Sequence, residues 1–285
     1  MKSKFKKIIL LVAIIAILYA VIHSSGEFYR IDIVGSTSIQ PIAEKLATEY
    51  LKNHSNLAIN VQGGGSGLGV RSIEEKIASV GMVSANLSTN EEKNVSKLLL
   101  GIEGIVVCVN KANPMNDLST EQLKNIFNGN INNWKEVGGS DSEIHVISRE
   151  DGSGTRLSFE SEVLNKTRLK TDAIIQSSTN AIEQAVAKDE KAIGYISYVY
   201  VGDDVKKLSI DGITISNNTI INNSYKLQSP FLFLIHNKED KNVKDFLNWV
   251  FSPEGMKIIE QKKVIPVHGN ELETIRSTVM NIPNS

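Results

Sequence analysis

The chain has 285 residues, a length typical of two domains or one large one. Hydrophobic residues make up 41% and charged residues 22% of the sequence, which excludes a disordered or fibrous chain. The formal net charge is −1, and residues 1–26 carry four lysines and no acid, so subtracting those four charges leaves −5 for the remainder. A mildly acidic body without a basic run argues against nucleic acid as a partner.

The first 26 residues have the layout of a targeting segment. Four lysines precede an unbroken apolar run of 15 residues, 8–22. This run is shorter than the roughly 20 residues of a membrane span but is typical of a signal-peptide core. Small residues follow it, and no cysteine that could carry a lipid does. We expect residues 1–26 to be either a cleaved signal peptide or a retained N-terminal membrane anchor, with the rest of the chain extracytoplasmic.

The cysteine and the histidines of this sequence indicate neither a disulfide nor a metal site. Cys108 is the only cysteine, so no intramolecular disulfide can form, and its apolar surroundings predict an inert buried side chain. The five histidines show no metal-ligand spacing. The sequence therefore predicts no metal site and no cofactor.

Apolar periodicity predicts alternating strands and helices in the first hundred residues. Strand, polar loop and helix repeat here, which is typical of a parallel α/β sheet. The expected strands are 29–34, 58–62 and 79–83, and the expected helices are 41–51 and a stretch that ends at Ala78.

The remainder of the chain has a second set of such units. Ser119 is placed to cap the first of its helices. The Asn-rich stretch 216–224 is expected to be a loop. The expected helices are 120–127, 157–164, 181–188, 243–251 and 254–262, and the expected strands are 143–148, 192–200 and 231–235.

Three loops share a composition rich in glycine and hydroxyl side chains, and each lies between a strand and a helix. They are Gly35–Ser38, Gly63–Gly67 and Gly152–Thr155. Free backbone N–H groups and the positive end of a helix meet at such a junction, which favours anion binding. Arg149 adds a guanidinium that can reach two oxygens at once. The three loops together predict a cradle for a tetrahedral oxyanion.

The spacing of the residues does not match other known motifs. Residues 63–69 match no G-x-G-x-x-G register, and no lysine follows them, so neither a dinucleotide site nor a P-loop is indicated. Ser153 has no glycine two residues before it, so a hydrolase nucleophile elbow is absent. A hydrolase of phosphoesters with Ser153 as its nucleophile stays an alternative without a paired base.

At this point the residues resemble the phosphate-binding components of ABC phosphate importers, within the two-domain periplasmic-type binding proteins. The pair formed by the Gly63–Gly67 loop and the run Arg149–Arg156 is the most specific part of the resemblance. The matching segments run in order over the chain and are 34–38, 61–67, 81–82, 123–127, 133–139, 147–156, 192–195, 252–255 and 265–267.

The resemblance implies an α/β, two-lobed periplasmic-binding-protein-like fold of type II, with the ligand in the interdomain cleft. Lobe 1 would comprise residues 27–110 plus 227–285, and lobe 2 residues 111–226. Two strands would cross between the lobes, near 105–109 and 231–235.

The family's ligand contacts carry over to seven residues of this sequence, and Asp151 would orient Arg149 by a charge-assisted bond. The seven are Thr37, Ser38, Ser66, Arg149, Ser153, Gly154 and Thr155.

One expected ligand residue departs from the family pattern. Many members have a carboxylate after the third strand, which accepts the proton of hydrogen phosphate and disfavours sulfate. Here that residue is Ser84, and relatives with serine often continue with arginine, where this chain has Ala85. A hydroxyl can accept the same proton but repels sulfate far less.

The resemblance also implies that the protein binds and carries a ligand and catalyses no reaction. The protein would bind inorganic phosphate outside the cytoplasm as a monomer and deliver it to the permease subunits of an ABC transporter. Binding of another oxyanion, such as sulfate or molybdate, stays open. So does a phosphate sensor anchored in the membrane by residues 1–26.

Overall fold

The structure is a computed structural model and describes residues 29–87 and 95–283. The expected signal or anchor segment, 1–26, lies outside the described residues. Within them, no helix combines the length and the apolar character that crossing a bilayer requires.

A parallel sheet forms the centre of the first lobe. β1 (Tyr29–Gly35) lies between β2 (Leu57–Gly63) and β3 (Val80–Val83) and pairs in parallel with both. Helices α2 (Gln40–Leu51) and α3 (Ser66–Glu74) connect the strands. The predicted strand–loop–helix repeat of this region is therefore confirmed, and it brings the ends of β1, β2 and β3 to one edge of the sheet.

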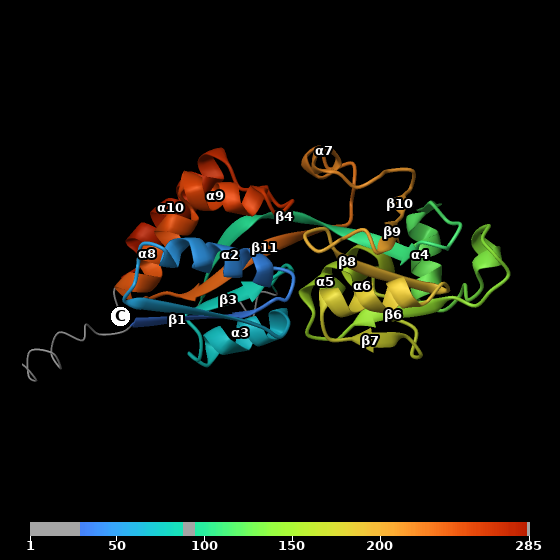
Figure 1. Cartoon of the computed structure of the whole chain (residues 1–285), viewed down its shortest axis with the longest axis horizontal. Coiled ribbons are helices and arrows are strands. Elements are labelled where there is room, and N and C mark those ends of the chain that lie inside the picture. Colours follow the sequence, from blue (N-terminus) through green and yellow to red (C-terminus); the bar gives the residue numbers. More distant parts are fainter. Residues whose placement is uncertain (1–28, 88–94, 284–285) are drawn as a thin grey trace, which may run out of the picture.

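Two strands pass between the lobes. β4 (Val95–Asn110) pairs with β11 (Gln228–His236) as far as Gly104. From Ile105 onward it pairs instead with β8 (Ala192–Ser197). Figure 1 shows the result: β4 and β11 run through the waist between two bodies.

The second lobe has its own sheet, in the order β4, β8, β6 (His145–Arg149), β7 (Ile174–Gln176). Ser119 caps α4 (Thr120–Phe127) as predicted, in a capping box with Gln122. The other elements of the chain are β5 (Asp117–Leu118), η1 (Trp134–Val137), α5 (Gly154–Phe159), η2 (Glu160–Leu164), α6 (Thr179–Lys188), β9 (Val205–Lys207), β10 (Ser209–Ile210), α7 (Asn217–Ile221), α8 (Lys241–Val250), α9 (Pro253–Glu260), β12 (Ile265–Pro266) and α10 (Gly269–Asn281).

Each lobe has a separate hydrophobic core. One cluster gathers buried side chains between Ile105 and Leu227, including Cys108, which is buried as expected. Another gathers side chains from Ile31 to Leu100 and from Phe231 to Ile282. The first lobe also holds a smaller cluster that includes Val70 and Leu234. Separate cores on either side of the crossing strands are the two-lobed α/β architecture that the sequence predicted.

Several elements differ from the sequence-based prediction. The stretch 216–224, expected to be a loop, contains α7, because Ser216 and Thr219 form a capping box that starts a helix despite the asparagines. The helix expected over 157–164 begins earlier, at Gly154, and continues as a π-helical turn. The strand expected over 192–200 ends at Ser197, where the chain turns.

Candidate functional site

The three predicted loops meet between the lobes. Gly65 precedes α3, Ser153 caps α5 by accepting the Arg156 N–H, and Ser38 lies in the turn before α2. Contacts join the two sides: Gly67 N donates to Gly152 O at 3.1 Å, and the hydroxyls of Ser38 and Thr155 lie 2.9 Å apart. The lobes are therefore closed on one another in this structure.

Glycine at position 154 allows this close approach. A Cβ there would lie 2.6 Å from both the carbonyl oxygen and the Oγ of Ser84, and closer still to Ser66 Oγ. Ser66 and Ser84 belong to the first lobe and Gly154 to the second. Any side chain at Gly154 would therefore push the two lobes apart.

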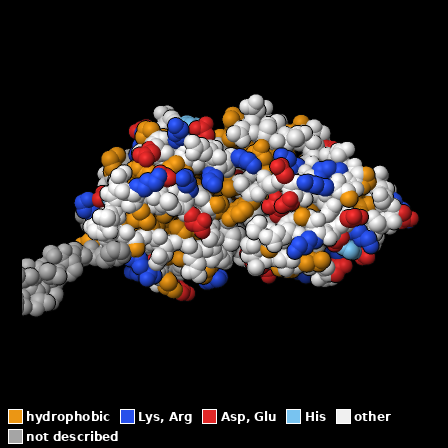
Figure 2. All heavy atoms as spheres, in the orientation of Figure 1, with side chains coloured by type: hydrophobic (Ala, Val, Ile, Leu, Met, Phe, Trp, Pro, Cys, Tyr) orange, Lys and Arg blue, Asp and Glu red, His pale blue; other side chains and the backbone are white. Residues whose placement is uncertain are grey.

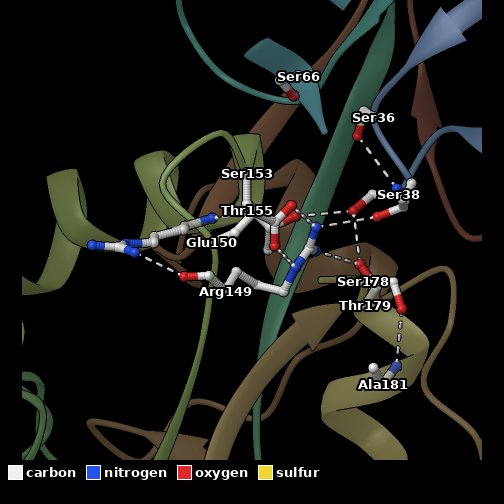
Figure 3. A network of polar contacts seen from close by, with 12 residues as sticks. Ser36, Ser38, Ser66, Arg149, Glu150, Ser153, Thr155, Ser178, Thr179 and Ala181 are labelled. Carbon is white, nitrogen blue, oxygen red and sulfur yellow. Dashed lines mark hydrogen bonds and ion pairs between the residues drawn. The ribbon is translucent and has the colours of Figure 1, made fainter. Parts of the chain in front are cut away.

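Arg149 is the buried cation of the site, at the end of β6 with its side chain 2% exposed. Its Nε and Nη2 bond the two carboxylate oxygens of Glu150, at 2.9 and 2.8 Å. Nη2 also donates to Thr37 Oγ1 at 3.3 Å, and Nη1 donates to Thr179 Oγ1 at 3.0 Å. Since a guanidinium has five N–H donors, these contacts leave one on Nη1. Figure 3 shows Arg149 in this position, with Ser38 and Thr179 beside it.

The expected pairing of Asp151 with Arg149 is wrong. Asp151 Oδ1 lies 2.6 Å from Arg156 Nη1, and the Asp151 side chain is 93% exposed. Glu150 takes the role instead, because Asp151 occupies the outer position of the turn after β6 while the longer Glu150 side chain folds back along the guanidinium. Arg156 Nη1 also donates to the Arg149 carbonyl at 2.8 Å, which fixes the end of β6.

A buried cluster of hydroxyls surrounds Ser84. Ser84 Oγ lies 2.8 Å from Ser36 Oγ and 3.4 Å from Ser66 Oγ, and Ser84 N donates to Ser66 Oγ at 3.0 Å. The Ser84 carbonyl accepts the Ser229 hydroxyl at 2.7 Å. Hydroxyls can donate or accept, so this side of the site adapts to the protonation state of an anion.

The structure thus brings all eight predicted site residues to one junction between the lobes. Thr37, Ser38, Ser66 and Ser84 come from the first lobe. Arg149, Ser153, Gly154 and Thr155 come from the second, and all of these except Thr37 are buried.

Sequence reasoning missed two residues of this junction. Thr179, the first residue of α6, bonds Arg149 and lies 3.2 Å from Ser38 Oγ. Tyr200 donates its hydroxyl to the Thr37 carbonyl at 2.8 Å, and burial raises the pKa of Tyr200 to about 12. Thr179 could have been found by the same pattern as the other loops, a hydroxyl-rich junction between a strand and a helix, since Ser178 caps the helix that follows β7. β7 has only three residues and was not recognisable as a strand.

The charge of the site is nearly balanced. Glu150 offsets Arg149, so an anion here would be bound chiefly by hydrogen bonds from hydroxyls and backbone N–H groups. Figure 2 shows acidic and basic side chains interspersed over both lobes on this face. No cluster of side chains suited to a metal occurs in the described part of the chain.

Comparisons with known proteins show the family of the chain. The family model for the PBP superfamily domain matches residues 23–254. The phosphate-binding protein PstS of Bacillus subtilis is 30% identical over 242 residues, which cover 82% of this chain and 80% of that protein. PstS of Borreliella burgdorferi is 27% identical over 272 residues, which cover 90% and 97% of the two chains.

Solved structures are similar as well. A putative phosphate ABC transporter substrate-binding protein from Clostridium perfringens, with bound phosphate, is 33% identical with a TM-score of 0.79, covering 84% of this chain and all of that one. An ABC-type phosphate transport receptor from Vibrio cholerae is 32% identical with a TM-score of 0.71, over 83% of this chain and 100% of the receptor. The chain belongs to the PBP superfamily, in the family of PstS phosphate-binding proteins.

Proposed function

We propose that this protein binds inorganic phosphate outside the cytoplasm and delivers it to the permease of an ABC importer. The observation that carries the proposal is the buried Arg149, whose guanidinium lies among hydroxyls from both lobes. The names of the PstS relatives and the phosphate-bound neighbour support it.

In this proposal the eight predicted residues form the phosphate site, and Thr179 joins them. Arg149 contributes its remaining N–H and its charge, while Ser38 and Thr155 contribute hydroxyls from opposite lobes. Thr37 and Thr179 accept bonds from Arg149. The hydroxyl hydrogen of Thr37 can therefore turn toward the ligand, and that of Thr179 can turn toward the ligand or toward Ser38 Oγ. Closure around the anion would then hold it away from water.

The division of the chain is part of the proposal. Residues 27–110 plus 227–285 act as one lobe and 111–226 as the other. We also propose that the protein works as a monomeric carrier without chemistry of its own. Residues 1–26 either direct its export and are removed or stay as a membrane anchor.

Phosphate is proposed over other oxyanions because hydroxyls such as Ser84 can accept a ligand proton, which sulfate lacks. The same hydroxyls can turn to donate to sulfate, so they favour phosphate only weakly. This discrimination is smaller than a carboxylate would give, since a hydroxyl has no charge to repel a dianion.

Isothermal titration calorimetry with phosphate, sulfate and molybdate tests the proposal. Phosphate should bind most tightly, and Arg149→Ala should lose most of the affinity while the protein still folds. Arg168→Ala removes an exposed arginine of the same lobe and should bind as the wild type does. Absence of phosphate binding, or tighter binding of sulfate, refutes the proposal.

A further inference from the structure

Glu103 is a buried carboxyl group that the anion site does not use. It lies on β4 directly before Gly104, at the point where the strand changes partners between the lobes. Its side chain is fully buried. Among the described residues, its Oε1 is the single buried side-chain oxygen or nitrogen without a hydrogen-bond partner. An unsatisfied oxygen of this kind is costly, so its position needs a physical explanation.

The contacts of Glu103 lie at the crossing between the lobes. Ser197, the last residue of β8, donates its hydroxyl to Glu103 Oε2. The Tyr198 N–H donates to the neighbouring Gly104 carbonyl at 2.9 Å and from there also favours the ionised carboxyl. On β11, Ser229 lies directly opposite Glu103 and donates to the carbonyl of Ser84, a residue of the proposed site. The carboxyl therefore sits where three strands of the hinge meet, next to the strand that supports the anion site.

Among the described residues, the surroundings of Glu103 offer hydroxyls and no ion-pair partner. β11 presents the uncharged Gln228 and Ser229 there. After β8 come Tyr198 and Tyr200, and Tyr200 is influenced electrostatically by Glu103 as well as by Glu44 and Arg149.

From the segment before β12, Lys263 Nζ lies 5.1 Å above the Tyr198 ring and donates to the Val201 carbonyl. Burial raises the pKa of Glu103 well above its usual range, and the Ser197 hydroxyl and the nearby Tyr198 N–H offset this only in part. The closed arrangement therefore favours the protonated form of Glu103.

We propose that Glu103 takes up a proton when the lobes close around the ligand, so that ligand affinity falls as the pH rises. The inference rests on the proposed function, because it needs a ligand that closes the lobes. Rotation of the lobes about Gly104 would part Ser197 from Glu103 and admit water to the crossing. The hydrated carboxyl would then ionise near the ordinary pKa of about 4.3.

The sign of the effect follows from linkage. A carboxyl group whose pKa is higher in the closed form than in the open form stabilises the closed form. This stabilisation is complete at pH values below the open-form pKa. This advantage is lost as the pH rises to the closed-form pKa. Between the two values, closure takes up one proton per molecule, and affinity falls by up to about tenfold per pH unit.

Calorimetry in two buffers of different ionisation enthalpy measures the protons taken up per phosphate bound. The purified protein and Glu103→Gln are compared at about pH 7, so that the titration of phosphate itself contributes equally to both. Glutamine has the shape of the neutral acid and cannot titrate. We expect the variant to take up nearly one proton fewer and to show a flatter dependence of affinity on pH.

Glu239→Gln is the matched control. Glu239 is also buried, and its pKa is raised to about 7, chiefly by burial. Its carboxylate accepts the His236 N–H at 2.7 Å, and its N–H bonds the Pro283 carbonyl, so these contacts lie away from the crossing. Closure should leave its protonation unchanged, and the variant should match the wild type.

If the wild type and Glu103→Gln both bind phosphate and take up equal numbers of protons, the inference about Glu103 is overturned but the proposed function stands. A wild type that binds no phosphate refutes the proposed function and the inference together. If Glu103→Gln does not fold, Ser197→Ala replaces it. Loss of that hydroxyl removes a bond that stabilises the ionised carboxyl, so the fall in affinity should move to higher pH. An unchanged pH profile would contradict the proposal.

Discussion

Replacing Gly154 with alanine tests the closed arrangement most specifically. The new Cβ would lie 2.6 Å from Ser84 Oγ, whereas ordinary contact begins at about 3.4 Å. The loops would have to part by roughly 1 Å, and overpacking of this kind costs about 1–3 kcal/mol. That energy corresponds to a loss of phosphate affinity of roughly 5- to 150-fold. The clash exists only with the lobes closed, so the unliganded protein should keep its thermal stability.

Calorimetry gives the affinities, and circular dichroism gives the melting temperature without ligand. Gly152→Ala is the control, because a Cβ at Gly152 meets nothing within 4 Å although the residue lies only two positions away. It should bind phosphate as tightly as the wild type. If Gly154→Ala also bound phosphate as tightly as the wild type, the lobes would not close on Ser66 and Ser84 when phosphate binds.

Three further predictions concern the side chains around the site and the core. At about pH 5, where phosphate is chiefly the monoanion, Glu150→Gln should raise sulfate affinity relative to phosphate by about tenfold, since removing a nearby negative charge favours a dianion more than a monoanion. Asp151→Asn, which changes an exposed side chain, should leave the ratio unchanged in calorimetry, and equal ratios for both variants would place Glu150 away from the ligand. Cys108, whose thiol pKa is raised by burial, should react with a thiol reagent only after denaturation, and rapid labelling of the folded protein would contradict its burial. Burial raises the pKa of Glu239 from 4.5 to about 7, so the melting temperature of the wild type should fall relative to Glu239→Gln as the pH rises between these values; parallel curves would show that Glu239 is hydrated.

The sequence predicted the fold where local patterns and tertiary structure agree. The helix α2 was predicted within one residue, because its apolar residues fall on one face and Pro41 begins it. The long strand β4 was visible only in its fully apolar half, 105–109, since residues 95–104 mix polar and apolar side chains. Its pairing with two sheets depends on distant segments that no local pattern reveals.

The site was predictable where composition alone identifies a residue type. Glycine and hydroxyl residues at the ends of β1, β2 and β6 indicated an anion cradle before any contact was known. The partner of Arg149 was not predictable, because Glu150 and Asp151 are adjacent carboxylates and only the path of the turn decides which one faces the guanidinium. No local pattern indicated that Glu103 is buried, because its burial results from the meeting of β4, β8 and β11.

The most direct test is a crystal structure of the protein grown with phosphate. One phosphate should lie between the lobes, bonded by Arg149 and by the hydroxyls of Ser38 and Thr155. Phosphate bound elsewhere, or a cleft that stays empty at saturating phosphate, would contradict this prediction.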